Sequence, residues 1–366
     1  MKKKILFVRP TLGYGGADRV TLNLLKGFDR EAYTCDLALM RAEGEFIPDI
    51  PQDVKVFDLK ANSLWSMWQP LKRLLKTSDY DILYSTCGGA SMPMMLAVLL
   101  AKYRGVTVVS ERNILFPPNK SKLKRRLMLL LKSVLYKRAT WVTAVSKGVA
   151  EECIQGLGLS HARVVVVNNP IINEDLVLGK DEILENTFFQ KFDQIMLSIG
   201  RFEWQKDYDT LLEAFEKVAQ INTNVGLFIL GKGPLAAHYK AKIAAMGLQE
   251  RIELGGFDKN PFKYLSACDV YVLSSRHEGM PGVLIQAMAC GTACVATDCP
   301  TGPNELIIHE VNGLLVPVGD VEGMAEAMLK ILHDKALRTR FAQHAPASVL
   351  RFHADKAITS YFNFLG

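Results

Sequence analysis

The chain has 366 residues, of which 49% are hydrophobic and 22% charged, with a formal net charge of +6 at neutral pH. This composition argues against intrinsic disorder, and the length suits two domains better than one hydrophobic core. The seven cysteines show neither C-x-x-C spacing nor nearby histidines, which argues against a zinc site and indicates reduced thiols in a cytosolic protein. The first apolar run stops at Arg9 and Pro10, so we expect a strand there and no signal peptide.

Short apolar runs alternate with amphipathic segments in both halves of the chain. Such alternation predicts an α/β protein with parallel, doubly wound sheets. The less periodic stretch 169–192 predicts the boundary between domains at 1–170 and 191–345, followed by a C-terminal helix in 346–366. The predicted strands are 4–8, 34–40, 54–59, 82–85, 106–110, 141–145, 164–167, 195–199, 225–230, 270–273, 294–296 and 314–316, and helices are predicted at 209–219 and about 346–364.

A glycine-containing loop, Leu12-Gly13-Tyr14-Gly15-Gly16-Ala17-Asp18-Arg19, follows the first strand and opens a helix. Glycines at such a place let a ligand approach the backbone, and the N–H groups of a helix N-terminus attract anions. The loop taken alone is weak evidence, because turn glycines are common at strand ends.

Charge is distributed unevenly between the two halves. Residues 1–170 contain 26 Lys and Arg against 14 Asp and Glu, whereas residues 171–366 contain 18 against 24. Residues 112–150 contain no acid at all, and 120–138 reads as a basic amphipathic helix. Such a helix favours an anionic membrane surface as its partner, with a core-packing helix whose basic face is solvated as the alternative. Nucleic acid is disfavoured because no base-reading motif is present.

Two segments of the C-terminal half combine cations, an acid and a helix N-terminus. The first runs from Ser198 to Asp207 and contains Arg201 and Lys206. The second runs from Ser274 to Gly291, where an apolar strand leads through a turn into a helix. The turn predicts an anion site, and the carboxylate of Glu278 beside it suits the hydroxyl groups of a sugar. A nucleotide sugar carries both kinds of group.

The same segments resemble the retaining glycosyltransferases of family 4, which have the GT-B fold. The family pattern EGxP…EAxAxG matches Glu278-Gly279-Met280-Pro281 and the helix after it, GRxxxxKD matches the segment from Gly200 to Asp207, and GGAE matches Gly15 to Asp18, with Asp in place of Glu. Gln286 stands where the family has its second glutamate. The resemblance implies two Rossmann-like domains facing a central cleft, with the final helix crossing back to the first domain.

The resemblance also implies roles for individual residues. Glu278, Arg201 and Lys206 are expected to be catalytic, with Glu278 on the donor sugar and the two cations on the departing diphosphate, where negative charge develops. No metal and no cofactor are expected beyond the nucleotide-sugar donor. The residues expected to bind the donor diphosphate or nucleotide are Gly15, Gly16, Arg201, Lys206, Gly279, Met280, Pro281, Gly282, Val283 and Gln286.

On the acceptor side, many relatives have a histidine at the end of the strand that here reads Val108-Val109-Ser110-Glu111-Arg112-Asn113. This chain has no histidine before His161, so Glu111, Arg112 and Asn113 are the acceptor-side candidates. His277 is expected to be a structural neighbour of Glu278. Without a nucleophile, the resemblance implies front-face transfer, in which the departing phosphate helps to deprotonate the acceptor hydroxyl.

The predicted function is a retaining glycosyltransferase that moves a hexose or N-acetylhexosamine from a nucleotide-diphosphate sugar, with UDP favoured. The basic first domain suggests a glycan acceptor on a lipid carrier, and hence a cytoplasmic protein peripheral on the inner face of the membrane, in polysaccharide or glycan assembly. The alternatives are a non-catalytic sugar-nucleotide-binding partner and a GT-B epimerase or phosphorylase. The sequence names neither the sugar, the acceptor, the linkage nor the oligomeric state.

Overall fold

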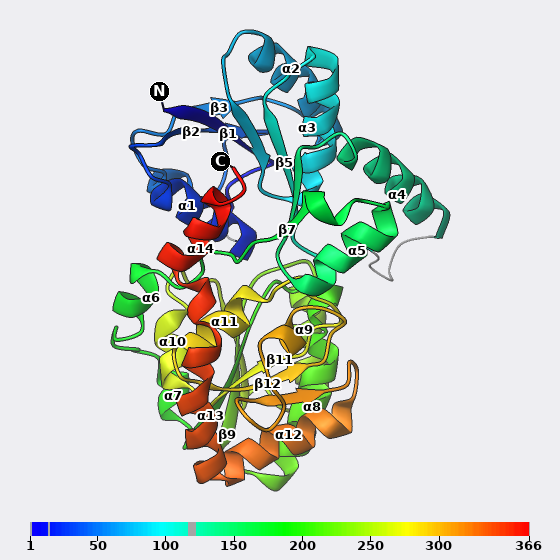
Figure 1. Ribbon diagram of the computed structural model, residues 1–366. Helices are drawn as coiled ribbons and strands as arrows, with labels where there is room; N and C mark the ends of the chain where they lie inside the picture. Colours follow the sequence, from blue (N-terminus) through cyan, green and yellow to red (C-terminus); the bar gives the residue numbers. More distant parts are fainter. Residues whose placement is uncertain (1, 14, 116–121, 366) are drawn as a thin grey trace. The chain divides into compact units, whose positions relative to one another are not determined.

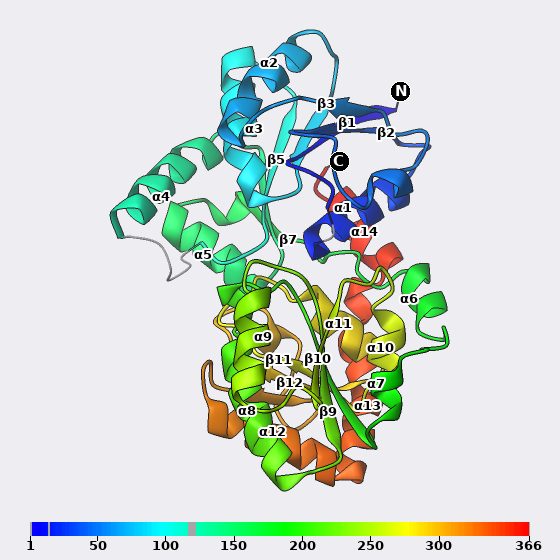
Figure 2. The same ribbon diagram turned by 180° about the vertical axis from the view of Figure 1, so that it is seen from behind.

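The computed structural model describes residues 2–13, 15–115 and 122–365. The chain divides into two compact units, Met1–Ile171 with Ala354–Gly366, and Ile172–His353. Figures 1 and 2 show that each unit is a sheet with helices packed on its two faces. The second unit takes in residues 172–190, which the sequence had left between the domains.

All strand pairs of unit 1 are parallel, in the order β3-β2-β1-β4-β5-β6-β7. The order reverses between β1 and β4, which is the switch point where doubly wound sheets bind ligands. Most strand residues are buried on both faces, which explains their apolar runs. The strands are β1 (Lys3–Arg9), β2 (Tyr33–Leu39), β3 (Val56–Asp58), β4 (Ile82–Ser85), β5 (Val106–Glu111), β6 (Trp141–Ala144) and β7 (Val164–Val166).

The helices of unit 1 include one that returns from the far end of the chain. Ile358 and Phe362 of this last helix pack on the end of the first one, where Phe362 lies 5.1 Å from Phe28 between ring centroids. Residues 120 and 121 of the predicted basic helix lie outside the described residues. The helices are α1 (Gly16–Gly27), α2 (Trp68–Lys76), α3 (Gly88–Ala101), α4 (Lys122–Tyr136), α5 (Lys147–Leu157) and α14 (Ala354–Phe362), with short 3₁₀ turns at Ile47–Asp49, Trp65–Met67 and His161–Arg163.

The sheet of unit 2 is also parallel, in the order β10-β9-β8-β11-β12-β13. Its switch point lies between β8 and β11. These strands lead into the two segments predicted to bind the donor, 198–207 and 274–291, which we call the donor segments. The strands are β8 (Gln194–Ile199), β9 (Val225–Leu230), β10 (Ile252–Gly256), β11 (Val270–Leu273), β12 (Ala293–Thr297) and β13 (Leu314–Val316).

The helices of unit 2 cover both faces of its sheet and enclose a core built mainly from α8, α12 and the central strands. Within the described part of the chain, no helix combines the length and apolar character needed to cross a bilayer. The helices are α6 (Glu174–Gly179), α7 (Thr187–Gln190), α8 (Tyr208–Ile221), α9 (Ala236–Ala245), α10 (Phe262–Ala267), α11 (Gly282–Ala289), α12 (Val321–His333) and α13 (Lys335–Ser348), with 3₁₀ turns at Trp204–Lys206, Pro303–Glu305 and Leu350–Phe352.

The prediction of parallel, doubly wound sheets is confirmed, but two elements differ from the sequence analysis. Strand β10 was missed because it is an edge strand that carries Glu253 and ends in Gly255-Gly256. The single helix expected from residue 346 is wrong: Pro346 belongs to the last turn of α13, a 3₁₀ turn follows, and the returning helix begins at Ala354.

Candidate functional site

The two donor segments of unit 2 are bonded to each other through main-chain and side-chain groups. The Arg276 N–H donates to the Gln205 carbonyl at 2.8 Å, and the Ser274 hydroxyl donates to the Lys206 carbonyl at 2.8 Å. The Arg276 guanidinium also pairs with Asp207, with 2.6 Å between Nη2 and Oδ1. The loops after β8 and β11 therefore form one rigid wall at the switch point of the sheet.

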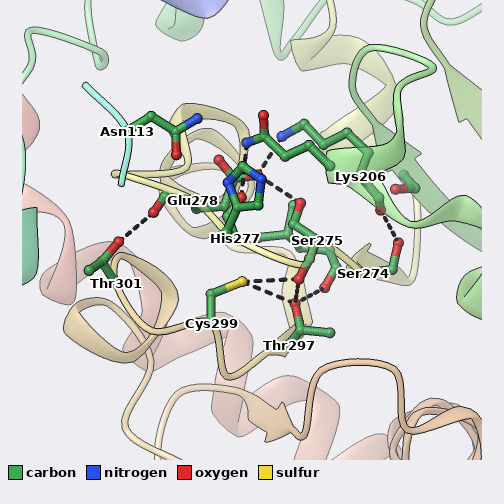
Figure 3. A network of polar contacts seen from close by, with 12 residues as sticks. Asn113, Lys206, Ser274, Ser275, His277, Glu278, Thr297, Cys299 and Thr301 are labelled. Carbon is green, nitrogen blue, oxygen red and sulfur yellow. Dashed lines mark hydrogen bonds and ion pairs between the residues drawn. The ribbon is translucent and has the colours of Figure 1, made fainter. Parts of the chain in front are cut away.

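Lys206 and Glu278 form a largely buried ion pair in this wall (Figure 3). Lys206 Nζ lies 2.5 Å from Glu278 Oε1, and the Ser275 hydroxyl donates to the same oxygen at 2.7 Å. Glu278 is only 6% exposed. Two of the predicted catalytic residues thus lie together, and the charge of Lys206 is already balanced by a carboxylate.

Behind Glu278, hydroxyl and thiol groups hold the backbone of the turn. Thr301 Oγ1 donates to the Glu278 carbonyl, and Thr297 Oγ1 donates to the Ser275 carbonyl at 2.6 Å. Cys299 Sγ lies 3.0 Å from the same Ser275 oxygen. The sequence alone does not assign this role to Thr297 and Cys299, because the role depends on the register between β11 and β12. Their signal in the sequence is a run of small polar residues directly after an apolar strand.

Arg201 lies in the same loop as Lys206 but is not drawn into the buried pair. Its Nη1 lies 3.0 Å from Glu203 Oε1, and its side chain is 54% exposed. The two predicted diphosphate cations therefore differ in exposure: the Lys206 side chain is 19% exposed, whereas that of Arg201 remains accessible.

Helix α11 begins at Gly282 and follows the turn directly. Pro281 occupies the N-cap position in an extended conformation, and no side chain of the described residues caps the helix. The N–H groups of its first turn are those that a helix leaves without internal partners. Met280 is buried beside them at 9% exposure. The predicted residues Gly279, Met280, Pro281, Gly282 and Val283 thus form the turn and first residues of a helix of the kind that binds anions.

Gln286 lies one turn further along α11 and is 7% exposed. An unpaired carboxylate at this depth would lose its hydration at a high cost in free energy, whereas burial of a neutral amide costs less. The glutamine therefore suits a position that is buried in the absence of a ligand.

A cavity of about 440 Å³ lies at the carboxyl ends of β8, β9 and β10. It is lined by Phe202, by the loop Gly231-Lys232-Gly233 and by the start of α9, with Lys240 also present. A Cβ atom on Gly233 would lie 2.6 Å from the Phe202 carbonyl oxygen, so only glycine fits there. The sequence analysis missed this cavity, although the pattern G-K-G-P directly after an apolar strand was the available signal.

Burial lowers the pKa of His277, and the nearby Glu278 carboxylate only partly opposes this effect. The imidazole is 5% exposed, beside the buried ion pair. This supports the interpretation of His277 as a structural neighbour that is neutral at pH 7.

We expect His277 to make unit 2 less stable in acid. Because the pKa of His277 is lower in the folded than in the unfolded state, unfolding takes up a proton at acid pH. The free energy of unfolding therefore does not depend on this group above the unfolded pKa of about 6.5, and it falls as the pH drops below that value. The melting temperature of the native protein should therefore fall more steeply between pH 7 and pH 5 than that of His277→Gln. His333→Gln, at an exposed position in the last turn of α12, is the control and should retain the native slope. Equal slopes for all three proteins would contradict this prediction.

In unit 1, the glycine loop is held by an internal ion pair. Asp18 pairs with Arg9, which is 5% exposed, and the second Asp18 oxygen accepts the Gly15 N–H at 3.0 Å. Gly15 is the N-cap of α1 and Gly16 its first residue, while Tyr14 lies outside the described residues. Asp18 thus fixes the predicted donor-side glycines at the switch point of unit 1 as a capping residue.

The three acceptor-side candidates at the end of β5 lie in different environments. Glu111 is 4% exposed and faces α4, where Lys132 Nζ lies 2.8 Å from Oε1 and the Tyr136 hydroxyl donates to the same oxygen. Arg112 donates through Nη1 to Asn169 Oδ1 at 2.9 Å, while its Nε and Nη2 are buried without a hydrogen-bond partner among the described residues. Asn113 accepts the Ile114 N–H at 2.8 Å. Glu111 therefore connects β5 to α4, and Arg112 is the candidate whose guanidinium has nitrogens without a partner among the described residues.

The described residues contain no group of three or more His, Cys, Asp or Glu that could hold a metal ion. All seven cysteines are free thiols, and burial raises the pKa of Cys290 to about 11 and that of Cys299 to about 12. These thiols are therefore protonated at neutral pH and are poor metal ligands and nucleophiles.

Comparisons with known proteins account for both units. The family model described as Glycosyltransferase Family 4 matches residues 14–174, and the model described as Glycosyl transferases group 1 matches residues 179–348. A curated relative from Campylobacter jejuni, N-acetylgalactosamine-N,N'-diacetylbacillosaminyl-diphospho-undecaprenol 4-alpha-N-acetylgalactosaminyltransferase, is 32% identical over 64% of this chain and 62% of its own length. The lipopolysaccharide core biosynthesis glycosyltransferase LpsE of Rhizobium meliloti is 32% identical over 46% of this chain and 48% of its own length.

The chain thus spans about half to two thirds of the length of these curated relatives. Among solved structures, the Anabaena protein HepE in complex with UDP and glucose is similar over 99% of both chains, with a TM-score of 0.82 and 22% identity. That likeness shows the fold. Since the two family models together match nearly all of residues 14–348, the chain belongs to the group 1 glycosyltransferases, with the GT-B fold.

Proposed function

We propose that the protein is a retaining glycosyltransferase that transfers a hexose or N-acetylhexosamine from a UDP-sugar to a glycan on a lipid carrier. The observation that carries the proposal is the buried pair of Lys206 and Glu278 beside the uncapped N-terminus of α11. A cation, an acid and free N–H groups at one switch point suit a ligand that has both a diphosphate and sugar hydroxyls.

In this proposal, donor binding rearranges the ion pair. The diphosphate takes Lys206 as its counter-ion, and Glu278, still held by Ser275, becomes free to accept hydrogen bonds from sugar hydroxyls. Arg201, which is half exposed, needs only to leave Glu203 to reach the same phosphates. Gln286 then contacts the ribose as a neutral partner, in the position where relatives have an acid. The cavity beside Gly231 and Gly233 lies on the same edge of the sheet and suits the nucleoside.

The chemical step follows from these contacts. The bond between the anomeric carbon and the β-phosphate oxygen breaks, and the acceptor hydroxyl oxygen forms the new bond on the same face of the sugar. The acceptor proton passes to the departing phosphate oxygen, so neither an enzymatic base nor a metal is required. Lys206, Arg201 and the N–H groups of Gly282 and Val283 stabilise the charge that develops on the phosphate. Gly15 and Gly16 leave room for substrate at the switch point of unit 1.

Arg112 and Asn113 are the residues we propose for the acceptor, because unit 1 contains the buried guanidinium atoms that lack partners. An acceptor diphosphate could accept hydrogen bonds from Nε and Nη2 of the Arg112 guanidinium. The relative from Campylobacter jejuni carries a diphospho-undecaprenol substrate in its name. We therefore place the reaction at the cytoplasmic face of a membrane, with the basic helix at 120–138 on the lipid surface, in the assembly of a surface polysaccharide or glycan.

A thermal-shift panel tests the donor. A ligand that binds only the folded state stabilises it by about 2.7 kcal/mol at a hundredfold excess over its dissociation constant. We expect UDP and at least one UDP-sugar to raise the melting temperature by several degrees, with GDP- and ADP-sugars having smaller effects, and we expect EDTA to abolish neither this shift nor transfer. If UDP-sugars gave no shift, or if GDP-sugars gave the largest one, the proposed donor would be wrong.

A further inference from the structure

Helix α4 is firmly attached to unit 1 by one of its faces. On that face Lys132, Leu135 and Tyr136 are buried, and the first and last of these contact Glu111 at the end of β5. The Ser133 hydroxyl donates to the Leu157 carbonyl of α5 at 2.6 Å. In Figures 1 and 2 the helix lies at the edge of unit 1, outside α3 and α5. It is therefore a fixed part of the unit with one side packed.

The other face of α4 is apolar and exposed. Leu123, Leu127 and Leu130 are 79%, 68% and 64% exposed, and Val134 and Leu131 are 55% and 39% exposed. With 3.6 residues per turn, these five side chains lie within an arc of about 100° opposite Lys132. A stripe of this width normally packs against a core, and soluble proteins rarely leave one uncovered.

The charges around the stripe indicate what covers it. Arg126 beside it and Arg138 beyond its end are exposed, and the helix contains no acid. Acid is absent throughout 112–150, while residues 1–170 have a strong basic excess. An apolar face with basic flanks and no acid matches the boundary between acyl chains and anionic headgroups. A protein partner or a second copy of this chain would have to place a row of acids around an apolar groove.

We propose that α4 inserts its leucine face, defined as Leu123, Leu127, Leu130, Leu131 and Val134, into the acyl region of an anionic bilayer. This inference deepens the proposed function and rests on its lipid-borne acceptor. It differs from adsorption by basic charge, because the apolar side chains cross the headgroup layer and provide the larger part of the binding. The buried Lys132 marks the opposite, protein-facing side of the helix and stays out of the lipid.

Because α4 is bonded to the end of β5, its insertion into the bilayer also affects the acceptor-side residues. Glu111 bonds Lys132 and Tyr136 of α4, and Arg112 and Asn113 follow it directly in the chain. A helix anchored in this way holds the end of β5 at a fixed distance from the bilayer. The diphosphate of a lipid carrier lies at the headgroup level, which is where these residues would meet it.

Vesicle sedimentation at two salt concentrations tests the inference. The vesicles contain phosphatidylglycerol and phosphatidylcholine, with neither glycan nor nucleotide sugar. At 1 M NaCl the Debye length is about 3 Å, so binding through charge alone is lost and binding through inserted leucines remains. We expect the native protein to sediment with the vesicles at both 0.1 M and 1 M NaCl. Leu127→Ser with Leu130→Ser should lower the partition coefficient at 1 M NaCl at least tenfold.

Two control variants separate apolar insertion from general surface effects. Leu178→Ser removes a leucine that is 76% exposed in unit 2 and should bind like the native protein. Arg126→Gln with Arg138→Gln should lose about fivefold per residue at low salt and little at 1 M. Circular dichroism and melting temperature confirm that each variant is folded.

The inference is overturned if the native protein fails to bind at 1 M NaCl or if the leucine variant binds like the native protein. It is also overturned if gel filtration shows a dimer that the leucine variant dissociates while vesicle binding is unchanged. Donor-induced thermal shifts on the same preparations report separately on the proposed function, because the vesicles contain neither of its substrates.

Discussion

Replacing Lys206 with alanine should reduce kcat/KM for transfer by about 10²- to 10³-fold, the loss typical of removing one preorganised group that stabilises charge in the transition state. Lys206 lies in the wall formed by the loops after β8 and β11, 2.5 Å from Glu278 and largely buried. Because the group works where negative charge develops on the phosphate, the loss should fall mainly on kcat. The kinetic constants of the purified variant, measured well below its melting temperature, check this.

The same substitution should also affect stability in the absence of donor. It leaves the Glu278 carboxylate without its cation, although the Ser275 hydroxyl still donates to it, and breaking a buried ion pair costs about 3–5 kcal/mol. A second variant, Lys206→Met with Glu278→Gln, removes both charges and should recover most of the melting temperature while remaining inactive. Comparison of the two variants thus separates the effect of Lys206 on activity from its effect on stability.

Lys191→Ala is the matched control for Lys206→Ala. Lys191 belongs to the same unit and also forms an ion pair, with 3.0 Å to Glu250, but its side chain is 52% exposed. Exposed pairs contribute only about 0.2–1 kcal/mol, so this variant should match the native protein in both rate and melting temperature. A Lys206→Ala variant whose kcat/KM stayed within threefold of the native value would remove Lys206 from the mechanism.

Much of the donor wall could be predicted from the sequence because its parts are continuous in the chain. The strand before Ser274 and the strand before Gly200 are apolar on both faces, and β8 and β11 are neighbours at a switch point. The carboxyl ends of such strands meet at one edge, which brings Lys206 to Glu278. The sequence did not predict which acid pairs with each cation. In the structure Arg201 pairs with Glu203, two residues away, and Lys206 pairs with Glu278.

The acceptor side was harder to predict for a physical reason. Nearly all residues of β5 are buried, so the alternation that tells the two faces of a strand apart is absent, and nothing in the sequence assigned Glu111 to the side of α4. In α4 itself, the run Leu127-Met128-Leu129-Leu130-Leu131 places apolar residues around most of the helix. Only the structure shows that Lys132 is inside and that Leu127 and Leu130 are outside.

Glu111→Ala should destabilise unit 1 by about 3–5 kcal/mol, because it leaves the Lys132 ammonium group buried without its carboxylate. The side chains of Glu111 and Lys132 are only 5% and 10% exposed, so water does not compensate for the lost charge. The Tyr136 hydroxyl loses its acceptor at the same time. Hydrogen exchange should show faster opening of the amides in β5 and α4, together with a lower melting temperature, while UDP binding in unit 2 is retained.

A double variant shows whether the charge, and not the side-chain volume, causes this loss. Glu111→Leu with Lys132→Met replaces both charges by apolar groups, and such replacements are often neutral or stabilising. We expect it to recover most of the stability that Glu111→Ala loses. Glu43→Ala breaks an exposed pair in the same unit, where the side chains of Arg41 and Glu43 are 46% and 67% exposed, and should change little. If Glu111→Ala were as stable as Glu43→Ala, Glu111 would not hold α4 to the sheet, and the end of β5 would be free to bind the acceptor through its carboxylate.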